Sequence, residues 1–302
     1  MGKIKNNKFI LILALSFIVL SACKESTKQA PYILWQLNSE TSLQMNSYVL
    51  KTPNNKTIVI DGGYKEDASY LKGFLAALGD TVDLWIITHP HADHICALTE
   101  ILTNPDHLYI NKVYGSLPSE NWVSKVAGEN STELKNLKDF IQALDDSKVE
   151  YTDLQLGEKF NLDKIELEIL GIKNPEIVEP NAINNSSLVF KMYLKNNSIL
   201  FLADLGYEGG EKLLKSKYAR KLPSDYVQMA HHGQGGVSEA FYKKVDPKYC
   251  LWPTPQWLWN NDQGKGTGTG PWQTLEVRGW MENLSVKENY IAADGIQRIE
   301  IY

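Results

Sequence analysis

The sequence predicts a layered α/β protein in which helices cover β-sheets, and three observations lead to this fold class. Short apolar runs rich in β-branched and aromatic residues recur along the chain, as in Leu84–Thr88 and Ile199–Ala203. Segments whose apolar residues repeat at spacings of three and four lie between these runs, as in 134–144. The 302 residues, of which 43% are hydrophobic and 22% charged, suffice to build a buried core between such layers.

The predicted strands are short apolar segments bounded by polar or turn-forming residues. In chain order they are Tyr32–Leu37, Ser47–Lys51, Thr57–Ile60, Leu84–Thr88, Tyr109–Tyr114, Ile165–Leu170, Leu188–Leu194, Ile199–Ala203, Tyr226–Ala230, Tyr249–Trp252, Tyr290–Ala293 and Gln297–Tyr302. The predicted helices are Ala68–Leu78, 131–144 with Ser131 as its N-cap, Glu208–Tyr218, Val237–Val245 and Trp272–Asn283. Neither an internal repeat nor a long linker divides the chain, so we expect residues 32–302 to form one domain.

Residues 1–22 have the pattern of a secretory signal peptide. Lys3, Lys5 and Lys8 precede an apolar run at 9–20. A helix of that length rises only about 18 Å, whereas the hydrocarbon core of a bilayer is about 30 Å thick. The run therefore predicts export of the chain and not a membrane span.

The predicted signal peptide ends in Leu20-Ser21-Ala22-Cys23, which resembles the lipobox of bacterial lipoproteins. The resemblance implies cleavage before Cys23, acylation of Cys23 and anchoring of an exported lipoprotein to a membrane of the cell envelope. Residues 23–31 would then be a polar tether. The alternative is ordinary secretion, in which Cys23 has no special role.

Charge and cysteine usage exclude several function classes. The net charge of −5 becomes −8 when residues 1–22, with three lysines and no acids, are removed. An acidic chain argues against a broad surface for binding nucleic acid. The absence of a CxxC pair excludes zinc ribbons and thioredoxin-like redox sites. Cys96 and Cys250 lie among apolar residues, and we expect buried thiols there in preference to a disulfide.

Five of the six histidines fall into two short windows, and the sixth, His107, is isolated and expected on the surface. The first window holds His89, His91, Asp93 and His94, and the second holds His231 and His232. The first window follows a predicted strand and is therefore expected in the loop at the C-terminal end of that strand, where ligands of α/β sheets preferentially bind. Because His-x-His and Asp-His pairs supply metal ligands, the pattern predicts a site for one or two metal ions.

The segment Thr88–His94 resembles the HxHxDH signature of the metallo-β-lactamase superfamily. The resemblance implies an αββα sandwich of two mixed sheets flanked by helices. It also implies one or two metal ions at one edge of the sheets, usually zinc, with manganese as an alternative. Three further segments fall in the order expected for this superfamily. Ile58–Gly63 precedes the signature, and Ser198–Gly206 and Tyr226–Gly233 follow it.

The resemblance assigns roles to residues within these segments. His89, His91 and His231 would hold one metal, Asp93 and His94 the other, and Asp204 would bridge the two. Asp61 would orient a ligand histidine from behind, although Asp-Gly-Gly is also a common turn. His232 would replace His231 as a ligand, donate a proton or contact an oxyanion, and Asp93 would also direct a proton to the leaving group.

One departure from the superfamily pattern indicates which branch of the superfamily the sequence resembles. Enzymes such as the β-lactamases and glyoxalases have a further metal histidine in the middle of the chain, but no histidine lies between His107 and His231. The segment Asn184–Phe190, followed later by His-His-Gly, resembles the ComEC-like branch. That branch includes the hydrolase domain of DNA-uptake channel proteins and a phosphorylcholine esterase of the bacterial cell wall. Asn185 would bind a metal weakly, contact the substrate or cap a turn.

The histidine pattern and the resemblance together predict a metal-dependent hydrolase, with phosphoesters or phosphodiesters as the favoured substrates. The acidic processed chain favours small or zwitterionic phosphoesters over extended nucleic acid. The alternatives are a hydrolase of carbon esters or lactones and a non-enzymatic surface binding module. The missing middle histidine argues against a β-lactamase.

Five of the eight tryptophans lie between residues 252 and 280, around the glycine-dense loop Gly264–Gly270. The loop lacks the spacing of a P-loop, so we expect no nucleotide cofactor. Two interpretations of the segment stay open. It forms a lid whose aromatic walls stack on a base, a sugar or a quaternary ammonium group, or its tryptophans pack within a helix and a long loop.

Overall fold

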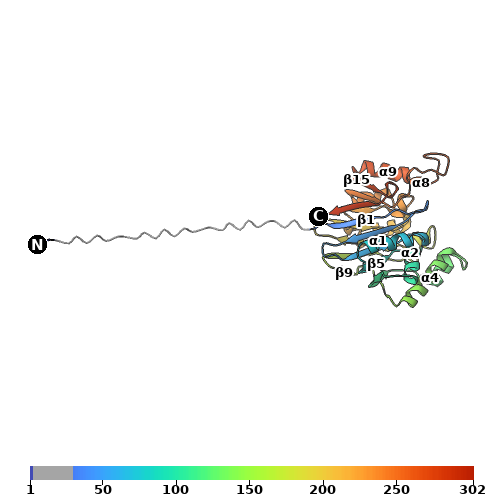
Figure 1. The fold of residues 1–302 in the computed structure, drawn as a ribbon. Helices are drawn as coiled ribbons and strands as arrows, with labels where there is room; N and C mark the ends of the chain where they lie inside the picture. Colours follow the sequence, from blue (N-terminus) through green and yellow to red (C-terminus); the bar gives the residue numbers. More distant parts are fainter. Residues whose placement is uncertain (3–29) are drawn as a thin grey trace.

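Two seven-stranded mixed sheets pack face to face in the computed structural model, which describes residues 1–2 and 30–302 (Figure 1). The predicted signal peptide beyond residue 2, most of the tether and Cys23 lie outside the described residues. The first sheet has the spatial order β16 (Gln297–Ile301), β1 (Tyr32–Gln36), β2 (Ser47–Lys51), β3 (Thr57–Asp61), β5 (Leu84–Ile87), β7 (Lys112–Gly115) and β8 (Glu150–Asp153). The second has the order β15 (Glu288–Ile291), β14 (Tyr249–Trp252), β13 (Tyr226–Gln228), β12 (Ser198–Phe201), β11 (Val189–Tyr193), β10 (Ile165–Gly171) and β9 (Lys159–Leu162). A small ribbon pairs β4 (Thr81–Val82) with β6 (Tyr109–Ile110).

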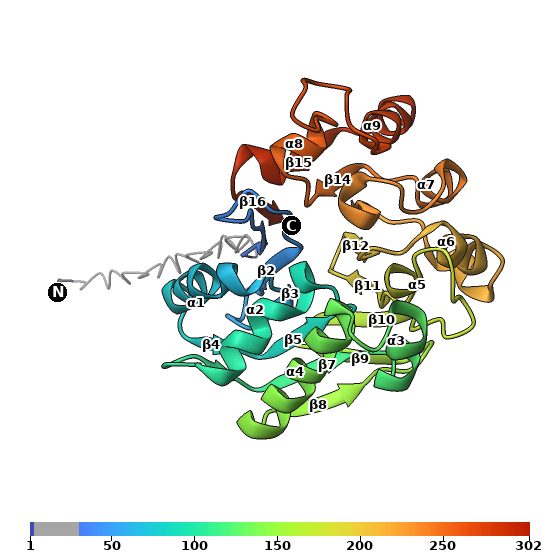
Figure 2. The ribbon, with the colours of Figure 1, turned by 90° about the vertical axis from the view of Figure 1, so that its right-hand side faces the viewer.

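Helices cover the outer faces of both sheets (Figure 2). The α-helices are α1 (Ala68–Ala77), α2 (Ala92–Thr103), α3 (Glu120–Ala127), α4 (Thr132–Ser147), α5 (Ala182–Asn185), α6 (Tyr207–Leu214), α7 (Glu239–Val245), α8 (Gln256–Trp259) and α9 (Thr274–Asn283). Short 3₁₀ turns occur at η1 (Lys65–Asp67), η2 (Lys217–Lys221), η3 (Ala230–Gly233) and η4 (Ala292–Asp294). The predicted αββα sandwich of two mixed sheets is thereby confirmed.

The central strands are apolar throughout because both of their faces are buried. Along β5, Leu84 and Ile86 face the second sheet, while Trp85 and Ile87 pack under the helices. Successive side chains of a strand point to opposite faces, so a strand between two layers needs apolar residues at every position. Phe201 of β12 meets Tyr48 of the first sheet edge to face, with ring centroids 5.3 Å apart.

The differences from the predicted elements have physical reasons. The strands β8 and β9 were not predicted because they lie at sheet edges and are partly exposed, which leaves them polar. The segment predicted as one strand at Tyr109–Tyr114 is divided at Asn111 into β6 and β7. The helix α2, the short helices α3, α5 and α8, and the ribbon strand β4 were also missed.

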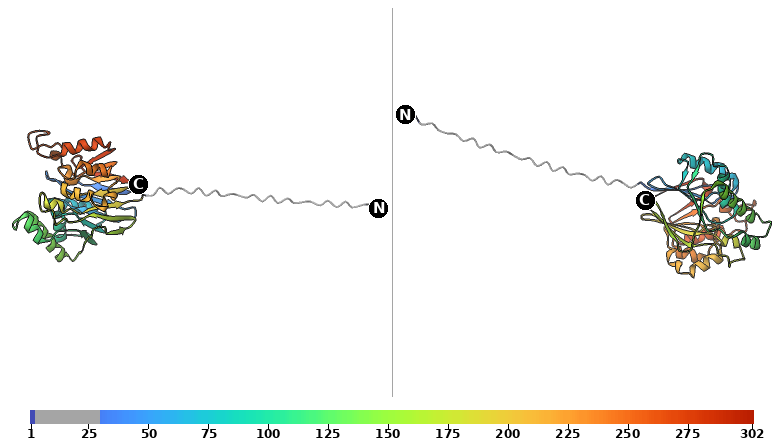
Figure 3. Two further views of the ribbon diagram at one scale, coloured as in Figure 1. Left: turned by 180° about the vertical axis from the view of Figure 1, so that it is seen from behind. Right: turned by 90° about the horizontal axis from the view of Figure 1, so that it is seen from below.

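The ends of the described domain lie together. Tyr32 of β1 pairs with Ile301 of β16, so the first and last strands are neighbours, and Figure 3 shows the C-terminus beside the start of the domain. Among the residues that the structure describes, none of the helices has the length and apolar character needed to cross a membrane. Cys96 and Cys250 are both free thiols, Cys250 buried as predicted and Cys96 only partly buried.

Candidate metal centre

The first histidine window forms the junction between β5 and α2. His89 and His91 lie in the loop after β5, and Asp93 and His94 lie in the first turn of α2, which begins at Ala92. The sequence placed all four in a loop, so this local prediction was wrong for Asp93 and His94. The helix turns both side chains inward and buries them, and the carboxylate of Asp93 suits a helix N-terminus.

The second sheet supplies the other side of the centre. Asp204 follows β12, and His231 and His232 lie in η3 after the parallel neighbour β13. His231, His232 and Ala203 have φ values of +50°, +53° and +49°, in the left-handed region that side chains with a Cβ rarely adopt. Such strain costs on the order of 1–3 kcal/mol per residue and is concentrated at functional sites.

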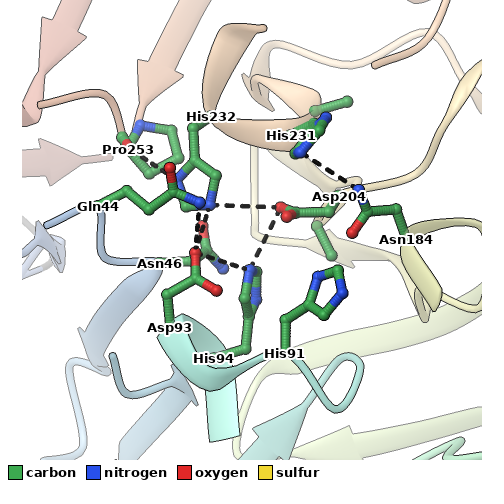
Figure 4. Close-up of polar contacts among 12 residues, drawn as sticks. Gln44, Asn46, His91, Asp93, His94, Asn184, Asp204, His231, His232 and Pro253 are labelled. Atoms are coloured by element: carbon green, nitrogen blue, oxygen red, sulfur yellow. Dashed lines mark hydrogen bonds and ion pairs between the residues drawn. The ribbon is translucent and has the colours of Figure 1, made fainter. Parts of the chain in front are cut away.

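Two groups of donor atoms share Asp204 (Figure 4). The first consists of His89, His91 and Asp204, and the second of Asp93, His94, His232 and Asp204. Within each group the donor atoms lie within 4.8 Å of one another. Asp204 Oδ1 lies 3.3 Å from His94 Nε2, and its Oδ2 lies 3.8 Å from His89 Nε2. A carboxylate that faces both groups is placed to bridge two ions.

The rear nitrogens of the imidazoles are held by other parts of the chain. His94 Nδ1 donates to Asp61 Oδ2 at 2.7 Å, and His232 Nδ1 donates to the carbonyl oxygen of Pro253 at 2.7 Å. Each bond keeps a hydrogen on Nδ1, so a metal that displaces the proton of Nε2 would meet a lone pair directed into the centre. Ligand histidines of metal sites are oriented by the same kind of partner.

Asp61 lies in the position that the resemblance predicts for it, behind a histidine of the donor set. Its carboxylate accepts from His94, from the backbone and hydroxyl of Thr88 at 2.8 and 2.7 Å, and from Asn46 Nδ2 at 2.7 Å. The Thr88 hydroxyl hydrogen goes to Asp61, so the Thr88 oxygen accepts from His89 Nδ1 at 3.2 Å. One buried carboxylate thus orients a histidine of each donor group.

The electrostatics of the centre favour a cation. Burial raises the pKa of Asp93 and Asp204, but His94 and His232 outweigh it, so the pKa of each carboxyl lies below its usual range. Burial also disfavours the charged form of His94, yet the carboxylates around it leave its pKa well above the ordinary value. By contrast, burial lowers the pKa of His89 and holds that imidazole neutral. Both carboxylates are therefore ionised, in an interior that strengthens their attraction for positive charge.

The centre fits a divalent metal. His94 Nε2, His232 Nε2 and Asp204 Oδ1 are buried, and their nearest polar neighbours are other donors of the centre: His232 Nε2 lies 2.9 Å from Asp93 Oδ2, and His94 Nε2 lies 3.3 Å from Asp204 Oδ1. Buried polar atoms need partners, and a cluster of ligand atoms that face only one another suits a cation between them. Imidazole nitrogen and carboxylate oxygen together are the ligands that zinc, manganese and iron accept.

The two adjacent histidines lie in different surroundings from those that the sequence suggested. His232 joins Asp93 and His94, whereas His231 belongs to neither donor group. His231 Nε2 faces the side-chain amide of Asn184 at 3.2 Å, on the opposite side of Asp204 from His232 (Figure 4). These donor groups differ from the predicted grouping of His231 with His89 and His91 and agree with the alternative in which His232 is the ligand, because the Pro253 carbonyl turns His232 into the centre.

The asparagine that faces the histidines is Asn184, whereas the sequence-based candidate was Asn185. The Asn185 side chain accepts from Gly209 N–H at 2.8 Å and donates to Pro180 O and Glu208, so it joins α5 to α6 and contacts neither donor group. Of its three predicted roles, the structural one fits these contacts. Adjacent residues of a helix point about 100° apart, so only one of the two asparagines can face the centre.

Three contributors were missed in the sequence. Gln44 Nε2 donates to Asp93 Oδ2 at 2.9 Å, Asn46 donates to Asp61, and the Pro253 carbonyl holds His232. A backbone carbonyl leaves no signal in a sequence, and the loop that carries Gln44 and Asn46 lacks any recognisable motif. His107 is exposed and remote from the centre, as predicted.

Comparison with known families now decides the ancestry of this centre. The family model described as the metallo-beta-lactamase superfamily matches residues 41–249, which include both histidine windows. The chain belongs to the metallo-β-lactamase superfamily. Members of this superfamily typically bind divalent metals, and the model match and the donor groups together make this chain a superfamily hydrolase with a candidate metal site.

Individual relatives agree with that membership. ComE operon protein 3 of Bacillus subtilis (strain 168) is 28% identical over 182 residues, which cover 59% of this chain and 21% of that protein. This similarity supports the predicted ComEC-like relation, and this chain spans about a fifth of that relative's length.

Solved structures share the fold at low sequence identity. The metallo-β-lactamase fold protein YhfI from Bacillus subtilis is 12% identical with a TM-score of 0.53, over 89% of this chain and 100% of that one. CmlA, a diiron β-hydroxylase from Streptomyces venezuelae, is 14% identical with a TM-score of 0.54, over 90% of this chain and 54% of that one.

Proposed function

We propose that this member of the metallo-β-lactamase superfamily is a zinc-dependent hydrolase of small phosphoesters or phosphodiesters that acts at the cell envelope. The observation that carries the proposal is the sharing of Asp204 by two donor groups. In two-metal hydrolases such a layout serves displacement at phosphorus, because both the attacking and the leaving oxygen need stabilisation.

The chain's own residues have distinct tasks in this proposal. When bound, the ions supply hydroxide at neutral pH and neutralise developing charge. Asp61 and the Pro253 carbonyl hold His94 and His232 in their ligand orientations. His231, partly exposed and outside both donor groups, contacts the substrate or hands a proton to the leaving group.

Two observations favour a small phosphoester. Asn184 belongs to the chain segment in which other superfamily enzymes carry a further metal histidine, and its side chain contacts His231. An asparagine in place of that histidine resembles the ComEC-like branch. The chain is also acidic, with a net charge of −5 that becomes −8 after removal of residues 1–22. Repulsion by that charge disfavours a long polyanion more than a small or zwitterionic phosphoester.

A substrate panel on the purified protein, loaded in turn with zinc, manganese or iron, tests the proposal. The panel is bis-p-nitrophenyl phosphate, p-nitrophenyl phosphorylcholine, a lactone and a chromogenic β-lactam. We expect one to two metal ions per chain and turnover of a phosphoester that is lost in His94→Ala and kept in His107→Ala, since His107 is exposed and outside the donor groups. Turnover of the lactone or the β-lactam alone would contradict phosphoester specificity, and failure to bind metal would contradict the metalloenzyme.

We also propose that the protein is a lipoprotein held at the membrane through Cys23. The support is the lipobox-like segment 20–23 and the polar tether that follows it. In cells fed labelled palmitate, the wild-type protein should carry the label and fractionate with membranes, and Cys23→Ser should do neither. An unlabelled wild-type protein in the soluble fraction would contradict the anchor.

A further inference from the structure

A cavity of about 470 Å³ opens between the β1–β2 loop and the segment that runs from β14 into α8. Met45 and Ser42 line it from the first wall, and Pro253, Gln256 and Trp257 line it from the second. Its volume is within the range of pockets that bind small molecules, about 300–1,000 Å³.

Both walls of this cavity also hold residues of the metal centre. Gln44, between two lining residues, donates to Asp93, and the carbonyl of Pro253 accepts from His232 Nδ1. The cavity therefore adjoins the segments that orient the second donor group, while none of the donors themselves lines it.

The lining is polar, aromatic and almost without charge. No lysine, arginine or histidine lines the cavity. The only carboxylate among the described lining residues is that of Asp262. Its Oδ1 accepts hydrogen bonds from the backbone N–H groups of Gly264, Lys265 and Gly266. Such a surface offers nothing to pair with a phosphate or another anion.

Neutral hydrogen-bonding groups are available beside an indole. The side-chain amides of Gln256 and Asn260 make no hydrogen bond within the described part of the chain, and both residues line the cavity. Trp257 is half-buried, is tied across the cavity by its indole N–H to Ser42 O at 2.9 Å, and packs against Trp272 with ring centroids 4.8 Å apart. An indole held in place beside free amides matches a ligand that has both apolar C–H faces and hydroxyl groups.

We propose that this cavity is a subsite for a sugar ring, and that the substrate reaches from the metal centre into it and is a phosphoester attached to an uncharged carbohydrate. The substrate part of the proposal rests on the proposed hydrolase function, whereas sugar binding by the cavity does not. Trp257 supplies the stacking surface, and Gln256 and Asn260 hydrogen-bond the hydroxyl or acetamido groups.

Calorimetric titration of the purified protein with chitotriose and with maltotriose, in the presence of a chelator, tests the subsite without any need for metal. We expect saturable binding of at least one trisaccharide, weakened about ten-fold or more by Trp257→Ala. Gln256→Ala and Asn260→Ala should each weaken it about three-fold to ten-fold, as expected for one hydrogen bond. These two side chains make no internal bonds, so their loss does not threaten folding.

Trp122→Ala is the matched control. Trp122 is also half-buried, and its indole N–H also bonds a backbone carbonyl, Pro175 O at 2.8 Å, but it lies outside this cavity. Sugar binding that survives in Trp122→Ala and falls in Trp257→Ala supports the subsite. Absence of sugar binding, equal losses in both variants, or preferential binding of phosphocholine or a dinucleotide would overturn it. Phosphoester turnover without sugar binding would refute the subsite alone, and sugar binding without turnover would refute the hydrolase alone.

Discussion

Replacing Asp61 by asparagine tests whether this buried carboxylate prepares the centre for metal. The substitution keeps the size of the side chain and removes only its charge and one acceptor. Asp61 Oδ2 accepts from His94, Thr88 and Asn46, and Oδ1 accepts from the Thr88 backbone N–H. An asparagine amide nitrogen in the Oδ2 position would face three hydrogen-bond donors, whereas in the Oδ1 position it would face only the Thr88 N–H. We therefore expect the nitrogen to take the Oδ1 position.

The magnitude follows from that count. Leaving one buried donor unpaired costs about 1–3 kcal/mol of folding free energy. His94 would also lose its charged partner, and loss of such an orienting group weakens metal binding about 10- to 100-fold. In free energy this weakening corresponds to about 1.4–2.8 kcal/mol.

Metal affinity, measured by competition with a chromophoric chelator, and thermal denaturation would be compared for Asp61→Asn and Asp67→Asn. Asp67 is also fully buried, and it accepts from Ser39, Glu40 and Tyr64, but it touches no donor of the centre. We expect both variants to lose stability and only Asp61→Asn to lose metal affinity. Unchanged affinity in folded Asp61→Asn, or an equal loss in both variants, would refute the orienting role.

Three further predictions concern the centre and the fold. His232→Ala should lose about one metal ion per chain, whereas His231→Ala should keep its metal and lose turnover. Metal analysis and kinetics of both variants check this prediction. The reverse pattern would support the grouping of His231 with His89 and His91. Removal of metal should lower the melting temperature, because an ion present at about 100 times its Kd stabilises the native state by about 2.7 kcal/mol; identical melting curves with and without chelator would contradict it. Ser131→Ala removes the hydroxyl that accepts from Leu134 N–H at 3.2 Å and should cost about 1 kcal/mol in chemical denaturation with turnover unchanged, and an unaltered midpoint would show that this cap contributes little.

Much of the sandwich could be predicted because its strands are buried on both faces. The apolar run at Leu84–Thr88 is visible in the sequence, and β5 forms there with alternate residues in two cores. The edge strands β8 and β9 could not be found in this way, since exposure removes the apolar pattern. The helix α2 did leave a signal, Ile95, Leu98 and Leu102 at helical spacing, and all three are buried.

The donor residues could be recognised from their motif, but their partners could not. Neighbours such as His231 and His232 are equivalent in the sequence, and only the left-handed backbone of η3 and a distant carbonyl decide which one turns inward. The same holds for Asn184 and Asn185, which a single turn of helix points in different directions. Motifs report residue types, whereas these choices depend on backbone geometry across the chain.

The centre and the cavity beside it depend on the same packing of the two sheets. Asp93 comes from the first sheet and His232 from the second, and their partners, Gln44 and the Pro253 carbonyl, belong to the two walls of the cavity. The Trp257 indole ties these walls together by a hydrogen bond to the β1–β2 loop. We therefore expect a molecule that fills the cavity to press on the segments that orient the donors, and a bound metal to restrain the same segments. Binding at the two places should be coupled for this reason, each site stabilising the arrangement of loops that the other requires.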